Sequence, residues 1–161
     1  MSAPVESMKV TELWRYPVKS IPGEQIQTSV VGERGLHADR MWAVHDQESG
    51  APLTARKLPI LLSCKARFAT DPANHPAEPG NAPEVEITMP GGDWTSSSDP
   101  QIHAALSTLV AREVQLRSLA PISDKSSYRG PFPDKTELRA FFGLGPEEPL
   151  PDLSMFPIRK M

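Results

Sequence analysis

Basic and hydroxyl side chains stand beside loop backbone at several points in the first part of the chain. The candidate binding residues are Lys19, Ser20, Arg40, Thr54 and Arg56. Side chains of these types on loops offer a phosphate or other oxyanion positive charge, hydrogen-bond donors and approachable backbone. The alternative is that they are solvated charges at strand ends, with Asp39 pairing an arginine. Composition alone favours this alternative.

The common catalytic patterns are not in the sequence, which has no nucleophile elbow, no phosphate-binding loop and no zinc-protease motif. The histidines, His37, His45, His75 and His103, lack the spacing of metal ligands. Cys64 is the single cysteine and lies in the apolar-leaning segment LLSCKARF, so we expect a buried residue and not a nucleophile. We therefore predict no catalytic residue and no metal ligand in this chain.

Length, charge and hydropathy exclude several other classes of protein. The 161 residues are enough for one domain, and a net charge of -3 without a basic stripe argues against a nucleic-acid partner. No window approaches the roughly 18 to 20 apolar residues of a membrane span, and the N-terminus lacks a signal-peptide pattern. We expect a cytoplasmic protein with no membrane and no nucleic-acid partner.

Alternating and β-branched segments predict a mainly antiparallel β domain. The expected strands cover residues 10–16, 25–31, 41–46, 62–68, 84–88, 93–97 and 114–119, with a short strand around Leu53. Residues 32–39 are expected to form a loop, 56–61 a helical turn or an irregular link, and 70–83 a flexible excursion. The loops between strands therefore have to position the candidate residues.

One long helix is expected near residues 100–112. Asp99 is a plausible N-cap, and Pro100 suits the first helical position. An apolar stripe follows at helical spacing, formed by Ile102, Ala105, Leu106, Leu109 and Val110. The predicted fold class is mainly β (α+β), a mostly antiparallel, closed and barrel-like sheet with one long helix.

The prediction for the chain's organisation is a domain over residues 1–119 and a proline-rich segment over 120–161. The chain has 18 prolines, crowded into its middle and C-terminal third. From residue 121 onward the apolar residues follow no core-forming pattern. We expect residues 121–161 to be largely disordered.

The candidate residues stand in an ordered set of motifs that resembles the N-terminal β-barrel domain of MOSC proteins. The matching positions are Tyr16, Pro17, Lys19 and Ser20, then Gly35, Leu36, Asp39, Arg40 and Trp42, then Leu53, Thr54, Arg56 and Pro59. Each motif is weak alone, but together in this order they are specific. The resemblance covers roughly residues 8 to 118 and includes the N-terminal half of the mitochondrial amidoxime-reducing component and its bacterial relatives.

The resemblance implies a domain that packs against a C-terminal MOSC domain, in cis or in trans, to hold the molybdenum cofactor (molybdopterin). It also implies that Lys19, Ser20 and Arg40 contact the anionic pterin, with Thr54 and Arg56 held more loosely. In the intact family, the implied chemistry is reduction of N-hydroxylated substrates with electrons from redox proteins. Those activities belong to the two-domain protein.

The family's metal-binding cysteine lies in the C-terminal domain, and Cys64 does not occupy its place. We therefore expect that this chain alone binds no cofactor and is inactive, and that residues 120–161 open the missing domain. The alternatives are a non-enzymatic module that binds a small anion or a partner, and a structural domain that completes another chain's MOSC half.

The strand order sets a condition on a shared site for Lys19 and Arg40. In a simple meander, the two loops would lie at opposite ends of a seven-residue strand, about 23 Å long. Joint contact with one phosphate therefore requires a crossover or a strong tilt of the strands.

Overall fold

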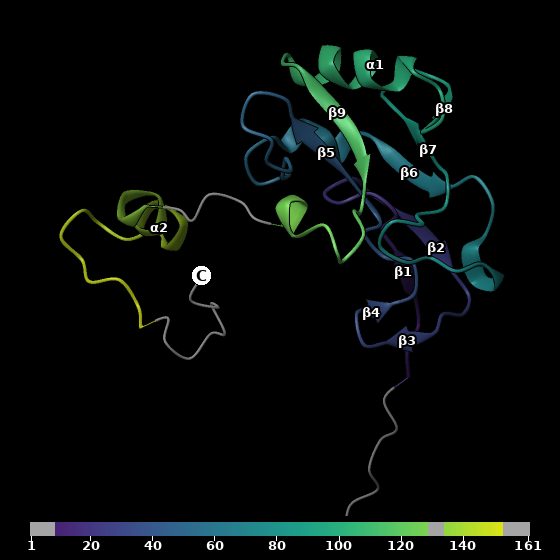
Figure 1. The fold of residues 1–161 in the computed structure, drawn as a ribbon, viewed down its shortest axis with the longest axis horizontal. Helices are drawn as coiled ribbons and strands as arrows, with labels where there is room; N and C mark the ends of the chain where they lie inside the picture. Colours follow the sequence, from purple (N-terminus) through teal and green to yellow (C-terminus); the bar gives the residue numbers. More distant parts are fainter. Residues whose placement is uncertain (1–8, 129–133, 153–161) are drawn as a thin grey trace, which may run out of the picture. The chain divides into compact units, whose positions relative to one another are not determined.

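The computed structural model describes residues 9–128 and 134–152 (Figure 1). The chain divides into two units, one that ends at Lys125 and one that begins at Ser126. The first unit contains every candidate binding residue.

The first unit is built from short antiparallel ladders. Its strands are β1 (Leu13–Arg15), β2 (Glu24–Ile26), β3 (Val31–Gly32), β4 (Gly35–Leu36), β5 (Trp42–Asp46), β6 (Lys65–Phe68), β7 (Val85–Thr88), β8 (Trp94–Ser96) and β9 (Val114–Ser118). They pair as β1-β2, β3-β4, β5-β9 and β6-β7-β8. Its 3-10 helices are η1 (Pro59–Ser63) and η2 (Pro72–Asn74), and η3 (Lys125–Tyr128) begins at the last residue of this unit and continues in the second. The predicted antiparallel β class is confirmed.

Single backbone hydrogen bonds join these ladders into a barrel-like arrangement. The amide of Ala66 on β6 donates to the carbonyl of Pro22 before β2, at 2.8 Å. The amide of Gly80 donates to Leu119 after β9, also at 2.8 Å. Because these links are isolated bonds, the described residues form no continuous closed barrel, and the predicted closed sheet is wrong in this respect.

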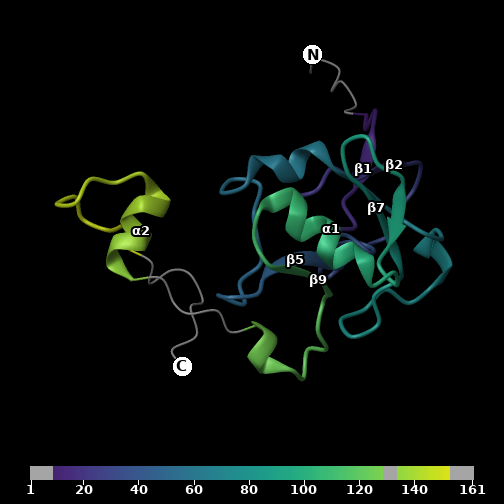
Figure 2. The same ribbon diagram turned by 90° about the horizontal axis from the view of Figure 1, so that it is seen from above.

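Helix α1 (Gln101–Val110) is the predicted long helix and lies across one end of the strands (Figures 1 and 2). Ile102, Leu106 and Val110 are buried, as the apolar stripe predicts. The helix begins one residue later than expected, yet the Asp99 carboxylate accepts from the amide of Gln101 at 2.8 Å, the bond expected of a capping residue. The sequence therefore locates the helix and its buried face correctly.

The core lies beneath α1 and between the ladders. Its residues include Val18, Ile21, Met41, Val44, Leu61, Cys64, Val85, Ile87, Val114 and Leu116. Val18 and Ile21 flank the candidate pair Lys19 and Ser20, so this loop is anchored on both sides by buried side chains. Burial of the neighbours fixes the loop's path, although Lys19 and Ser20 themselves are only half-buried.

Three predicted strands are shorter than expected. The strand predicted over 62–68 begins only at Lys65, because Leu62 and Ser63 belong to η1. The predicted strand over 25–31 pairs only up to Ile26, and Val31 instead opens the β3-β4 hairpin, where a loop was expected. Gly35, with φ of 97°, supplies the left-handed backbone of that turn. The short strand expected around Leu53 is reduced to a bridge between Pro52 and His45. These changes shorten three strands and add one hairpin without altering the fold class.

The second unit contains helix α2 (Lys135–Phe142), which the sequence analysis did not predict. The Asp134 carboxylate accepts from the amides of Thr136 and Glu137, and the Glu137 carboxylate accepts from the amide of Asp134, a complete capping box. The helix has no buried residue. Among the described residues, no helix is long and apolar enough to cross a membrane.

Candidate functional site

Strand β5 is the element that brings the sequence motifs together. At its start, the amide of Arg40 donates to the carbonyl of Tyr16 at 2.7 Å, and the amide of Lys19 donates to the carbonyl of Trp42 at 2.8 Å. Val18 and Trp42 form a parallel bridge. The segments 16–19 and 40–42 therefore run side by side in the same direction.

This parallel pairing supplies the crossover that a simple meander lacks. The bond to Trp42 limits the separation of the Lys19 and Arg40 Cα atoms to at most roughly 14 Å, since consecutive Cα atoms are about 3.8 Å apart. The Lys19 side chain is half-buried, and the Arg40 side chain is 66% exposed. The two cations thus emerge from adjacent backbone, as a shared anion site requires.

The third motif reaches the same edge of β5. The amide of Leu53 donates to the carbonyl of Val44 at 2.8 Å, two residues along the strand from the carbonyl that Lys19 contacts. Such positions are roughly 7 Å apart. The carbonyl of Thr54 then accepts from the amides of Lys57 and Leu58, which forms a turn. Thr54 is half-buried, and Arg56 is exposed within this turn.

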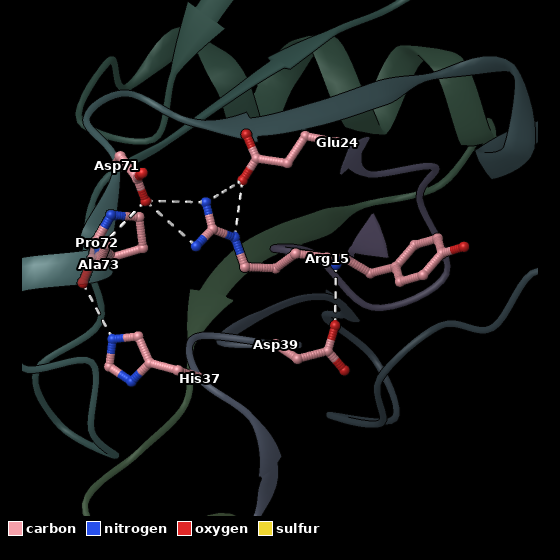
Figure 3. A network of polar contacts seen from close by, with 8 residues as sticks. Arg15, Glu24, His37, Asp39, Asp71, Pro72 and Ala73 are labelled. Atoms are coloured by element: carbon pink, nitrogen blue, oxygen red, sulfur yellow. Dashed lines mark hydrogen bonds and ion pairs between the residues drawn. The ribbon is translucent and has the colours of Figure 1, made fainter. Parts of the chain in front are cut away.

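Asp39 joins the first two segments through both of its carboxylate oxygens. One oxygen accepts from the backbone amide of Tyr16 at 2.9 Å (Figure 3), and the other contacts Nε of Arg40 at 2.7 Å. The Asp39 side chain is only 12% exposed. The pairing of Asp39 with an arginine, the basis of the alternative interpretation, is therefore present. Asp39 also ties that arginine to the loop that carries Lys19.

The backbone of these segments is unusual for residues other than glycine. Ser20, Ala38 and Arg40 have φ of 66°, 62° and 53°, in the left-handed region. Ala111 is the fourth such residue in the described part of the chain. Each left-handed residue of this kind costs about 1 to 3 kcal/mol, and such residues gather at binding sites. Their concentration here favours a functional role for this backbone.

A buried ion pair anchors β1 behind the site, and the sequence analysis missed it. Arg15 is 4% exposed and contacts the Glu24 carboxylate at 2.7 Å (Figure 3). Its guanidinium also lies over the Phe68 ring, 4.9 Å from the ring centre. Asp71 lies at 3.4 Å. The sequence feature that could have revealed it is the alternation of the strand. This alternation places Arg15 on the inner face, between the exposed Trp14 and Tyr16.

The histidine side chains that form hydrogen bonds among the described residues form them with backbone groups. A ring nitrogen of His37 hydrogen-bonds the carbonyl of Pro72 at 3.0 Å (Figure 3). Nδ1 of His103 accepts from the amide of Leu116 at 3.2 Å and so ties α1 to β9. His103 is half-buried, so this bond gives it a structural role.

The described residues do not form a metal centre. Residues 9–128 and 134–152 contain no group of three or more His, Cys, Asp or Glu side chains placed to hold a metal ion. Cys64 is 1% exposed, and its burial raises the pKa of the thiol, so the predicted inert, buried cysteine is what the structure has. The arrangement at β5 suits an oxyanion and not a metal.

The family model described as the MOSC N-terminal beta barrel domain matches residues 7–119. Comparison with curated proteins and with solved structures gave no match. The matched range includes the β5 edge and all five candidate binding residues. The chain therefore belongs to the family of MOSC N-terminal β-barrel domains.

Proposed function

We propose that this domain supplies the anion-contacting part of a molybdenum-cofactor site. Lys19, Ser20 and Arg40 bind the phosphate-bearing pterin, and the turn containing Thr54 and Arg56 lies at the edge of the same site. The observation that supports the proposal is the parallel pairing of segments 16–19 and 40–42, which places the backbone of Lys19 and of Arg40 on neighbouring segments.

The side chains present fit the phosphate of such a cofactor. The Arg40 guanidinium uses Nε for Asp39, and within the described residues its Nη groups and the Ser20 hydroxyl have no hydrogen-bond partner. The Lys19 ammonium adds a compact charge from the adjacent segment. A planar guanidinium, an ammonium and a hydroxyl form a donor set that recognises phosphate oxygens.

Lys19, Ser20 and Arg40 do not have the side chains that would ligate the molybdenum of such a cofactor. A soft metal centre is fixed by thiolate, and the buried Cys64 is not placed to supply one. We infer that a C-terminal MOSC domain, in cis or in trans, provides the thiolate and that this chain alone is inactive. When bound, the cofactor would supply oxygen-atom transfer in reduction of N-hydroxylated substrates, with electrons from partner redox proteins.

A second candidate is a non-enzymatic module that binds a small anion. The observation that favours it is the donor set itself, since Lys19, Ser20 and Arg40 would recognise a phosphate whatever group it is attached to. The two functions differ in the ligand's organic part. Equal affinity for inorganic phosphate and for a pterin phosphate would favour the module.

The test is a titration of ¹⁵N-labelled protein, followed by NMR, with molybdopterin under anaerobic conditions and with a pterin phosphate surrogate. The missing thiolate led to the expectation that the chain alone binds no cofactor. Because the phosphate donors already lie on adjacent backbone segments, we propose instead that it binds the pterin phosphate, with saturable shifts at Lys19, Ser20 and Arg40 and weaker binding by Lys19→Gln. Lys65→Gln, which removes the same charge from β6, is the matched control and should bind like the wild type. No saturable shift at millimolar ligand would overturn the proposal for the isolated chain.

A further inference from the structure

The Asp39 carboxylate contacts both the backbone amide of Tyr16 and the side chain of Arg40, so it links the two segments of the proposed anion site. We propose that it is a positioning residue, which holds the Arg40 guanidinium and the Tyr16 backbone in the arrangement that an anion requires. This inference rests on the proposed function. It assigns a separate role to a carboxylate that would not itself touch the ligand.

The geometry supports positioning because the carboxylate is fixed and the cation is exposed. The amide of Tyr16 holds one oxygen at 2.9 Å, and the side chain is 12% exposed, so Asp39 has little freedom. Its other oxygen holds Nε of the 66% exposed Arg40 side chain at 2.7 Å. A long side chain that is already immobilised loses less entropy when a ligand binds.

The bond to Nε also determines which donors face a ligand. A guanidinium presents its donors in a rigid planar fork, so fixing Nε fixes the direction of both Nη groups. In the part of the chain that the structure describes, those groups have no acceptor. Asp39 thus leaves the bidentate side of Arg40 available for an oxyanion.

Charge alone predicts the opposite effect of Asp39. A carboxylate near an anion site repels the anion, so its removal should strengthen binding. Positioning predicts that removal weakens binding, because Arg40 would have to be ordered at the moment of association. The sign of the affinity change therefore separates the two roles.

The experiment measures the affinity of the pterin phosphate surrogate for the wild type, Asp39→Asn and Asp39→Glu by NMR titration. Asparagine keeps one acceptor oxygen for the Tyr16 amide but replaces the other oxygen with an NH2 group, which cannot accept from Nε of Arg40. Glutamate keeps the charge and moves the carboxylate by one methylene. We expect each variant to raise Kd about three- to tenfold.

Glu86→Gln is the matched control, since it breaks another carboxylate-to-Nε pair, with Arg67 at 2.8 Å, in the β6-β7 ladder. It should leave Kd within about twofold of the wild type. The Hε proton of Arg40 gives a second readout without ligand: it should exchange with water faster in both Asp39 variants.

Tighter or unchanged binding by Asp39→Asn, with wild-type binding intact, would overturn the positioning role and leave the proposed function standing. Unchanged binding by Asp39→Glu would do the same, and it covers the case in which the asparagine variant fails to fold. Absence of binding by the wild type would overturn the proposed function, and this inference with it.

Discussion

The backbone amide of Arg40 donates to the carbonyl of Tyr16 at 2.7 Å and thereby joins two different ladders. Tyr16 follows β1, which pairs with β2, whereas Arg40 precedes β5, which pairs with β9. This hydrogen bond lies three residues before Lys19 and at the backbone of Arg40 itself. The same contacts therefore hold the fold together and place the proposed anion site.

Gly23 tests how tightly this joint is packed. A Cβ built on Gly23 would lie 2.0 Å from the carbonyl oxygen of Arg15 and 2.9 Å from the Cα of Tyr16. Both are backbone atoms and cannot move aside alone. We expect Gly23→Ala to lower the free energy of unfolding by about 3 kcal/mol or more, measured by urea denaturation, and to shift the amide signals of Tyr16 and Arg40.

Gly32→Ala is the control for this substitution. A Cβ on Gly32 meets no atom within 4 Å, and its φ lies outside the left-handed region. Its unfolding free energy should stay within about 0.5 kcal/mol of the wild type. Equal stability of the two alanine variants would show that the close approach of Gly23 to Arg15 is not maintained in solution.

The buried Arg15 should depend strongly on Glu24. Glu24→Ala would leave a guanidinium that is 4% exposed with only the 3.4 Å contact to Asp71, and uncompensated buried charges of this kind cost about 3 to 5 kcal/mol. Asp71→Ala, at a carboxylate that is 72% exposed, should cost about 1 kcal/mol or less. Urea denaturation of both variants checks this difference, and similar losses would contradict it.

The helix and most strands could be predicted because their signals are local. The spacing of Ile102, Leu106 and Val110 is enough to place α1 and its buried face, and the alternation of buried β-branched residues locates β7. Helix α2 also had a local signal, the capping box between Asp134 and Glu137, which the proline-rich surroundings obscured. The sequence therefore contained enough information to predict this helix.

The geometry of the site could not be predicted in this way. It depends on β5 pairing with β9, Trp42 opposite Ser118, which leaves the other edge of β5 open to the segment around Val18. Such pairings join residues far apart in the sequence, and no local pattern encodes them. The resemblance to MOSC proteins identified the residues, but the role of Asp39 between Tyr16 and Arg40 became visible only in three dimensions.

Helix α2 also gives a test of the predicted disorder after residue 120. An eight-residue helix without a buried side chain is marginal in water, even with a capping box, and Phe141 is 63% exposed. We expect amides of α2 to exchange within the dead time of a hydrogen-exchange experiment. The amides of Leu106 and Val110 in the buried α1 should be protected for much longer. Comparable protection of the two helices would contradict the prediction of disorder.

Asp46, the last residue of β5, should make stability fall in acid. Its carboxylate accepts from the amide of Ser49 at 2.7 Å and from the Ser49 hydroxyl at 2.8 Å, and it contacts Arg112 at 3.2 Å. These contacts, led by the Ser49 amide, hold the pKa of Asp46 below its ordinary value of 3.8. Asp46 therefore stabilises the fold above that ordinary value, and the contribution disappears as the pH falls through the lowered pKa.

Asp46→Asn isolates this contribution. The wild type should be more stable than the variant by a constant amount from about pH 7 to pH 5, and the difference should shrink below about pH 4 as the wild-type carboxylate takes up a proton. Ser49→Ala keeps the amide donor and removes only the hydroxyl, so its difference should be smaller and should shrink in the same pH window. Thermal or urea unfolding at a series of pH values measures both. A gap between wild type and Asp46→Asn that stays constant into strong acid would mean that Asp46 does not prefer its charged form in the folded protein.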